Sequence, residues 1–161
     1  MRIIVDIAVK ALSAAINDPT TAVQALDHLE NVLCLLGSQP LHRQLTFRDQ
    51  TGATRLFMPG RTWNDYLTLG VTEIREYGAS TIQVMRRLRA ILDALKLSVR
   101  PEHREAVLAE IARLDSTLAA GFSGSVDMDL AEVGDRQGIG GPGRATTTAV
   151  SLSTSTSDLK P

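Results

Sequence analysis

The chain has 161 residues, a length typical of one domain, and 43% of them are hydrophobic, which is enough for a core. Aromatic residues make up only 4%, so the core must be aliphatic, which suits packed helices better than a β-sandwich. The net charge of -1 gives no overall attraction to nucleic acid, and no segment approaches the ~20 apolar residues that span a bilayer. We therefore expect the chain, as given, to be soluble and cytoplasmic.

The N-terminal part predicts two amphipathic helices. Apolar residues within 3–12 recur at the three-and-four spacing of a helix that begins almost at the first residue. A second helix should begin at Pro19, because proline at the first helical position loses no needed N–H and Asp18 can cap the free amides. Gly37 provides its stop. We expect the buried face of the first helix to contain Ile3, Ile4, Ile7, Ala8, Ala11 and Leu12.

At about residues 44–58 the spacing of the apolar residues changes, and every second residue is now apolar. Leu45 and Phe47 alternate with polar residues before a polar turn, and Leu56 and Met58 alternate after it. This pattern predicts a β-hairpin whose turn uses Gly52 at a positive φ. Two strands alone are only marginally stable, so we expect the hairpin to pack on the helices or to pair with another strand.

Three further helices complete the predicted domain. Thr62 can cap a third helix that ends at Gly78, Ser80 can cap a fourth, and Pro101 opens a fifth. In the fourth helix the apolar residues face inward, and the arginines occupy more exposed positions. The predicted fold is mainly α, within an α+β class: about five helices packed together, with one hairpin between the second and the third.

The composition changes sharply beyond Gly121. Glycine, serine and threonine dominate there, as in 138–143 and 153–157, so little apolar surface is available to offset the entropy of ordering the chain. We therefore divide the chain into a helical domain at 1–121 and a disordered tail at 122–161, within which 127–133 could form one short helix.

Two sequence blocks carry a family resemblance. The first runs from Val5 to Ala22 and contains Ile16-Asn17-Asp18-Pro19-Thr20-Thr21, and the second begins with Ile74-Arg75-Glu76-Tyr77-Gly78-Ala79. With them the chain resembles, over about residues 3–120, the domain of unknown function 2254 family of predicted bacterial membrane proteins. The resemblance implies that transmembrane helices come first and that this region follows as a soluble domain. It therefore implies a truncated chain, partnered in the full-length, membrane-associated protein by an upstream transmembrane segment, and it supplies no catalytic residue.

The loop before the second helix is the first candidate site. Asn17, Asp18, Thr20 and Thr21 place polar side chains at a helix N-terminus, where amides could bind an anion or oxygen atoms could hold a cation. The same residues serve equally as an ordinary cap and turn, which is the favoured interpretation. Neither a compact metal-ligand motif nor a phosphate-binding glycine loop is present, so we expect no metal site and no cofactor.

Arginines on the fourth helix form the second candidate site. Arg86, Arg87 and Arg89 could make a positive face toward an anionic lipid surface. The alternative is a solvated helix face, in which Arg89 pairs with Asp93 one turn away. No nucleic-acid-binding motif accompanies these arginines, so nucleic acid is not an expected partner.

We expect a non-enzymatic module, and the family resemblance implies that it is the soluble C-terminal regulatory or assembly domain of a bacterial membrane protein. Such a module could form a homo-oligomer through its helices and its hairpin edge. The alternative hypothesis is a domain that binds a small anion or metal ion at the loop from Asn17 to Thr21, with hydrolysis as the activity such a site could support.

Overall fold

The computed structural model describes residues 1–41, 44–122 and 132–135. Its helical body consists of α1 (Arg2–Ala11), α2 (Pro19–Gly37), α3 (Trp63–Tyr77), α4 (Ile82–Ser98) and α5 (Arg104–Gly121). A short 3-10 helix, η1 (Pro101–His103), leads into α5, and the strands β1 (Gln44–Arg48) and β2 (Thr54–Pro59) lie between α2 and α3. The predicted mainly helical fold with one hairpin is confirmed.

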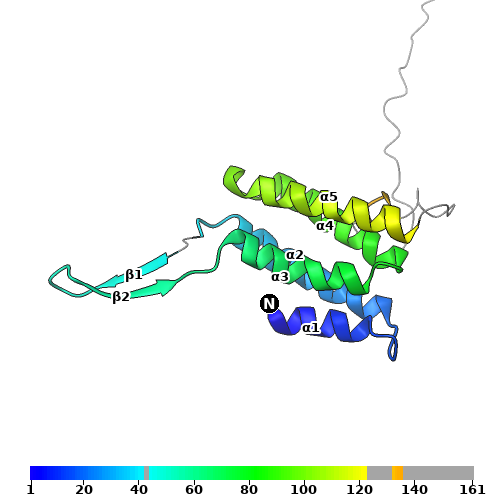
Figure 1. The fold of residues 1–161 in the computed structure, drawn as a ribbon, viewed down its shortest axis with the longest axis horizontal. Helices are drawn as coiled ribbons and strands as arrows, with labels where there is room; N and C mark the ends of the chain where they lie inside the picture. The colour runs from blue at the N-terminus through cyan, green and yellow to red at the C-terminus, as the bar shows by residue number, and fades with distance from the viewer. Residues whose placement is uncertain (42–43, 123–131, 136–161) are drawn as a thin grey trace, which may run out of the picture.

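The helices are stacked in layers (Figure 1). α2 and α3 lie between α1 on one side and the pair formed by α4 and α5 on the other. α1 packs on α2 and α3, α4 packs mainly on α2, and α5 packs on α3 and α4. None of the described helices is both long and apolar enough to span a bilayer.

Local sequence signals set most helix ends. α2 begins at Pro19 after the cap residue Asp18, and α3 begins after Thr62, which forms a capping box with Asp65. Both starts were predicted. α4 begins one residue later than expected, because Thr81 rather than Ser80 is its N-cap and makes no side-chain capping bond. Pro101 opens η1, as its missing N–H allows.

The core is aliphatic, as the composition predicts, with Trp63 as its one aromatic member among the described buried residues. The predicted buried face of α1 is wrong in part. Val5 and Ala8 are fully buried, whereas Ile3 is 75% exposed and Ile7 is 48% exposed. Because α1 lies at the edge of the body and contacts only one layer of helices, its apolar arc is wider than the side that it can bury.

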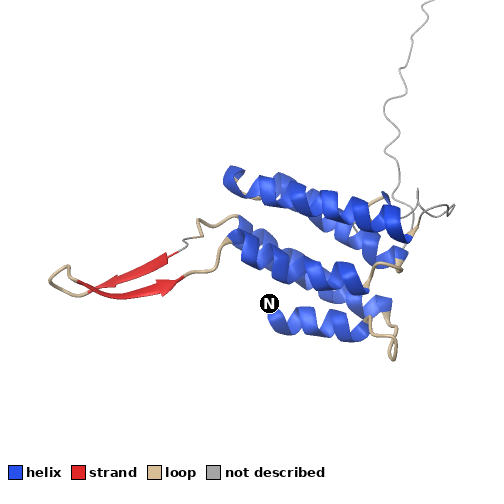
Figure 2. Ribbon diagram, viewed as in Figure 1, coloured by secondary structure: helices blue, strands red, loops and turns tan. Residues whose placement is uncertain are grey.

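The hairpin projects away from the helical body (Figure 2). β1 and β2 pair antiparallel, and Gly52 takes the predicted positive φ of 83° in the turn. All five residues of β1 are exposed, so the expectation that the hairpin packs on the helices is wrong. The described residues also contain no further strand to pair with it. The hairpin extends past the ends of α2 and α3, so no helix surface lies beside its strands.

Most of the predicted tail, including nearly all of the predicted short helix at 127–133, lies outside the described residues. Residues 132–135 are described and lie against α4. The N–H of Asp135 donates to the carbonyl of Arg86 at 3.1 Å, and the Asp135 residue is buried.

Candidate functional site

The predicted loop site connects α1 to α2. Asn17 adopts a positive φ of 47°, which asparagine tolerates better than most residues. The N–H of Asn17 donates to the carbonyl of Ser13 at 2.8 Å, and the N–H of Asp18 donates to the carbonyl of Ala11, also at 2.8 Å. The loop is therefore tied back to the end of α1.

Asp18 caps α2, as the sequence predicts. Its Oδ1 accepts from the N–H of Thr21 at 3.1 Å, and its Oδ2 accepts from the Thr21 hydroxyl at 2.5 Å. These hydrogen bonds stabilise the carboxylate and lower the pKa of Asp18. The side chains of Asn17 and Thr20 are exposed and add no further contact to this cap. Both carboxylate oxygens thus have a local structural role.

The predicted arginine site has a different geometry from the one expected. Arg86 is 2% exposed and Arg87 is 5% exposed, so the prediction that these residues occupy exposed positions is wrong. Arg89 is only partly exposed, and it pairs with Asp115 on α5 rather than with Asp93. The three arginines therefore do not offer the open positive face on which a contact with an anionic lipid surface depends.

Arg87 joins α4 to α2. Its Nε donates to Asp27 Oδ1 at 2.6 Å, and its Nη2 pairs with the Glu30 carboxylate. A buried guanidinium needs such partners, because an unpaired charge in the interior is strongly destabilising. Sequence reasoning missed this pairing, since Asp27 and Glu30 are far from Arg87 along the chain.

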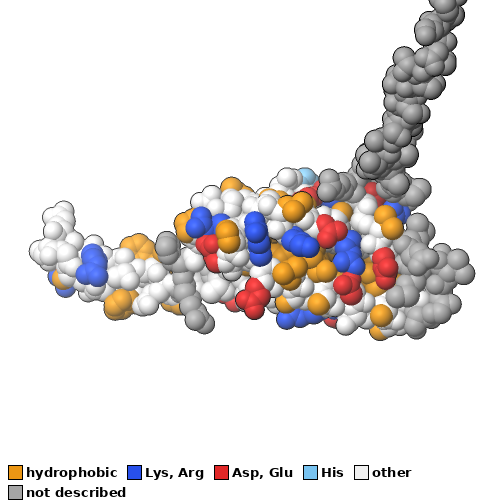
Figure 3. Space-filling model, turned by 90° about the horizontal axis from the view of Figure 1, so that it is seen from above, with side chains coloured by type: hydrophobic (Ala, Val, Ile, Leu, Met, Phe, Trp, Pro, Cys, Tyr) orange, Lys and Arg blue, Asp and Glu red, His pale blue; other side chains and the backbone are white. Residues whose placement is uncertain are grey.

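Comparable polar contacts join other helices. Arg2 on α1 pairs with Glu73 on α3 at 2.7 Å, and Arg75 on α3 donates to the Thr117 hydroxyl on α5 at 2.7 Å. On α4, Arg86 Nε donates to the Val133 carbonyl at 2.9 Å. The visible face of the body in Figure 3 accordingly carries basic and acidic side chains interspersed. The Arg2 and Arg75 contacts join α3 to α1 and to α5, and the Arg86 contact holds residues 132–135 against α4, so all three have a structural role.

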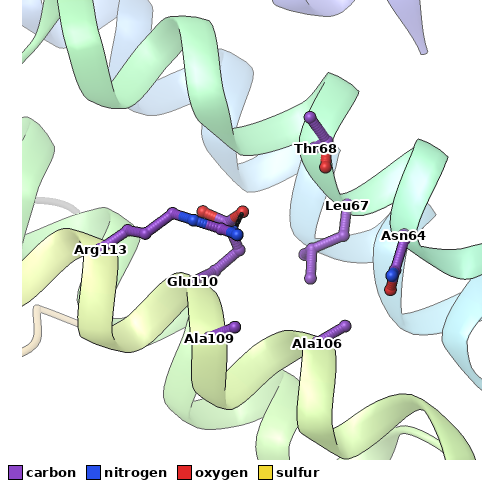
Figure 4. Close-up of a pocket in the computed structure, with 7 residues that line it drawn as sticks. All are labelled: Asn64, Leu67, Thr68, Ala106, Ala109, Glu110 and Arg113. Carbon is purple, nitrogen blue, oxygen red and sulfur yellow. Dashed lines mark hydrogen bonds and ion pairs between the residues drawn. The ribbon is translucent and has the colours of Figure 1, made fainter.

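A small pocket lies between α3 and α5 (Figure 4). Glu110 and Arg113 project into it from α5, opposite Asn64 and Thr68 on α3. Glu110 is 1% exposed, its Oε1 pairs with Arg113, and its Oε2 has no hydrogen-bond partner among the described residues. The cavity of about 90 Å³ has room for a few water molecules, which would satisfy that oxygen. No signal in the sequence indicates this pocket, because a lone glutamate on an amphipathic helix is typical of a solvated face.

His103 lies at the base of the hairpin and holds three segments together. Its ring stacks on Trp63 with centroids 5.2 Å apart, and its carbonyl accepts from Trp63 Nε1 at 3.1 Å. Its Nδ1 lies 3.0 Å from the carbonyl of Gly37 and must donate, since a carbonyl oxygen only accepts. A Cβ on Gly37 would lie 2.5 Å from Val99 Cγ1 and 3.1 Å from the Trp63 ring, so a larger residue there would force these packed side chains to shift.

The described residues contain no group of three or more His, Cys, Asp or Glu side chains that could hold a metal ion. Asp18 caps α2 and Asp27 pairs with Arg87, so each of these two carboxylates has a structural partner. What the arrangement supports is cohesion between helices and, at the base of the hairpin, a fixed exit for the two strands.

Comparison with known proteins gives one family and several uncharacterized relatives. Residues 1–94 match the model of a family described as predicted membrane protein, DUF2254. An uncharacterized protein of Mycobacterium tuberculosis and one of Mycobacterium bovis are each 38% identical over 113 residues, which is 70% of this chain. The chain spans only 22% of the length of these relatives. No solved structure matches the chain.

Proposed function

Since the chain belongs to the DUF2254 family of predicted membrane proteins, we propose that it is an extramembrane assembly domain of a larger membrane protein. In this proposal the transmembrane segment lies upstream in the longer protein, and the domain is on the cytoplasmic side. Two facts support the part of this proposal that places the domain outside the membrane in a longer protein. The chain spans 22% of its mycobacterial relatives, and none of its described helices could cross a bilayer.

The observation that carries the assembly role is the projecting hairpin. The helices bury their apolar side chains in a shared hydrophobic core. In contrast, β1 and β2 expose several large apolar side chains that nothing in the described chain covers. Apolar sheet surface of this kind marks an interaction site in a soluble domain. His103 holds together the end of α2 and the start of α3, which are the two points of the body nearest to the hairpin in sequence.

Membrane fractionation of a full-length mycobacterial relative tests the proposal. We expect the full-length protein in the membrane pellet, resistant to extraction with high salt or carbonate and released by detergent. The matching region expressed alone should stay in the supernatant, which serves as the control. Recovery of the full-length protein wholly in the soluble fraction would overturn the proposal.

A further inference from the structure

One face of the hairpin is entirely apolar. The register pairs Leu45 with Met58 and Phe47 with Leu56, and alternation along each strand places these residues on the same side. We call this set, Leu45, Phe47, Leu56 and Met58, the apolar hairpin face. Its members are 40–53% exposed, and Figure 3 shows hydrophobic side chains along the hairpin. The opposite side carries the cross-strand pair of Thr46 and Phe57.

The face needs a partner from outside the described chain. A two-stranded hairpin is marginally stable by itself, and an antiparallel sheet with one apolar side normally buries that side. The helical body does not cover it, because the hairpin points away from the helices (Figure 2). The end that projects furthest is polar, with Asp49 bonded to Thr51 and paired with Arg55 at 2.6 Å. A lipid surface met end-on would contact those charges first, which disfavours insertion of the hairpin into a membrane.

We propose that the apolar hairpin face is a homodimer interface, in which the hairpins of two copies of this chain stack face to face. This inference rests on the proposed assembly role and specifies its partner. The face is self-complementary, because it carries no charged side chain and has one large apolar residue at each of its positions. A two-fold axis through its centre therefore sets apolar side chains against apolar side chains along the whole face, without repulsion between like charges.

The area of the face sets the strength of this dimer. At about 200 Å² for each residue of this size, the exposed fractions correspond to about 370 Å² of mainly apolar surface per copy. A dimer that covers the whole face then buries about 740 Å² of this surface, or about 1,100 Å² in total if about 65% of the interface is apolar. That total lies just below the range of stable interfaces, so we expect a weak and reversible dimer rather than a permanent one.

Sedimentation equilibrium of the 161-residue chain over about 1–200 μM tests the proposal. We expect a monomer–dimer equilibrium within this range in the wild type. The double variant Phe47→Thr/Leu56→Thr, which keeps residues suited to strands, should raise the Kd by at least tenfold. Its helical circular dichroism should stay unchanged, because neither side chain contacts the core. Its Tm should also equal that of the wild type when both are measured well below the wild-type Kd, where dimerisation adds nothing to stability. Phe57→Thr is the matched control, since Phe57 is the most exposed hairpin aromatic but lies on the other side, and it should leave the Kd unchanged.

Several results would overturn this inference. A wild type that stays monomeric to 200 μM would do so, as would equal loss of dimer in the Phe57 variant and in the double variant. Binding of a monomer to vesicles of phosphatidylglycerol and phosphatidylcholine, abolished by the double variant, would assign the face to lipid instead. Each of these results would leave intact the membrane location of a full-length relative, so failure of the homodimer is distinguishable from failure of the proposed function.

Discussion

Trp63 donates its indole N–H to the backbone carbonyl of His103 at 3.1 Å while its ring stacks on the imidazole of the same residue. Trp63 is the first residue of α3, and His103 is the last of η1. His103 also bonds Gly37, where α2 ends before the hairpin. One histidine thus contacts both ends of the segment between Gly37 and Trp63, which contains β1 and β2.

Trp63→Phe should lower the free energy of unfolding by at least about 1–2 kcal/mol, because the His103 carbonyl loses this donor and the smaller phenyl ring leaves a void in the core. Urea denaturation followed by circular dichroism measures this change. Tyr77→Phe is a suitable control, since Tyr77 is exposed and its change should stay within about 0.5 kcal/mol. Equal stability of the Trp63 variant and the wild type would contradict the role of this contact.

The ion pairs of Arg87 with α2 should contribute more to the free energy of unfolding than an ion pair on the surface. Arg87→Ala should lower the free energy of unfolding by about 2–3 kcal/mol, since it leaves Asp27 and Glu30 without their cation and removes a packed side chain. Arg100→Ala, which removes the exposed pair with Glu102, should cost about 0–1 kcal/mol. Chemical denaturation of both variants in parallel measures the difference. Similar losses in the two variants would show that burial of Arg87 contributes nothing.

The cap at α2 gives a prediction about the loop from Asn17 to Thr21. Asp18→Ala should lower the free energy of unfolding by about 1 kcal/mol, because the first turn of α2 loses its acceptor. Asp18→Asn keeps an acceptor oxygen and should retain most of the stability. Thermal unfolding at neutral pH compares the two variants. If both variants unfold at the wild-type temperature, the capping interpretation is wrong.

The same carboxylate makes stability depend on pH. Hydrogen bonds from Thr21 lower the pKa of Asp18, and bonds from Thr51 and Arg55 lower the pKa of Asp49. A depressed folded-state pKa contributes stability that is present above the unfolded value of about 3.9 and is lost as the pH falls through the folded value. The Tm should therefore fall on acidification below about pH 4, and less steeply in Asp18→Asn. Parallel slopes for the variant and the wild type between about pH 4 and pH 2 would refute this linkage.

Signals that act over a few residues allowed much of the fold to be predicted. Asp18-Pro19 marks the start of α2, Thr62 marks that of α3, and Gly52 marks the hairpin turn. Each is a local effect of capping or of φ preference, so neighbouring residues contain the necessary information.

Contacts between distant residues could not be predicted in this way. Helical periodicity assigns arginines to the outside, whereas Arg87 is buried because Asp27 and Glu30 lie on a helix that only the tertiary fold brings near. The free apolar side of the hairpin was missed for the related reason that alternation predicts which residues share a face but not what covers it. The burial of Glu110 likewise depends on how α5 packs on α3.

The assembly role is tested most directly by the native mass of a full-length mycobacterial relative in detergent, measured by light scattering after size-exclusion chromatography. The comparison is between the intact protein and a variant that lacks the 113-residue region matched by this chain. We predict that both remain in the membrane fraction, that the intact protein is an oligomer, and that the variant has the mass of a monomer. An unchanged number of subunits after the deletion would contradict the assembly role.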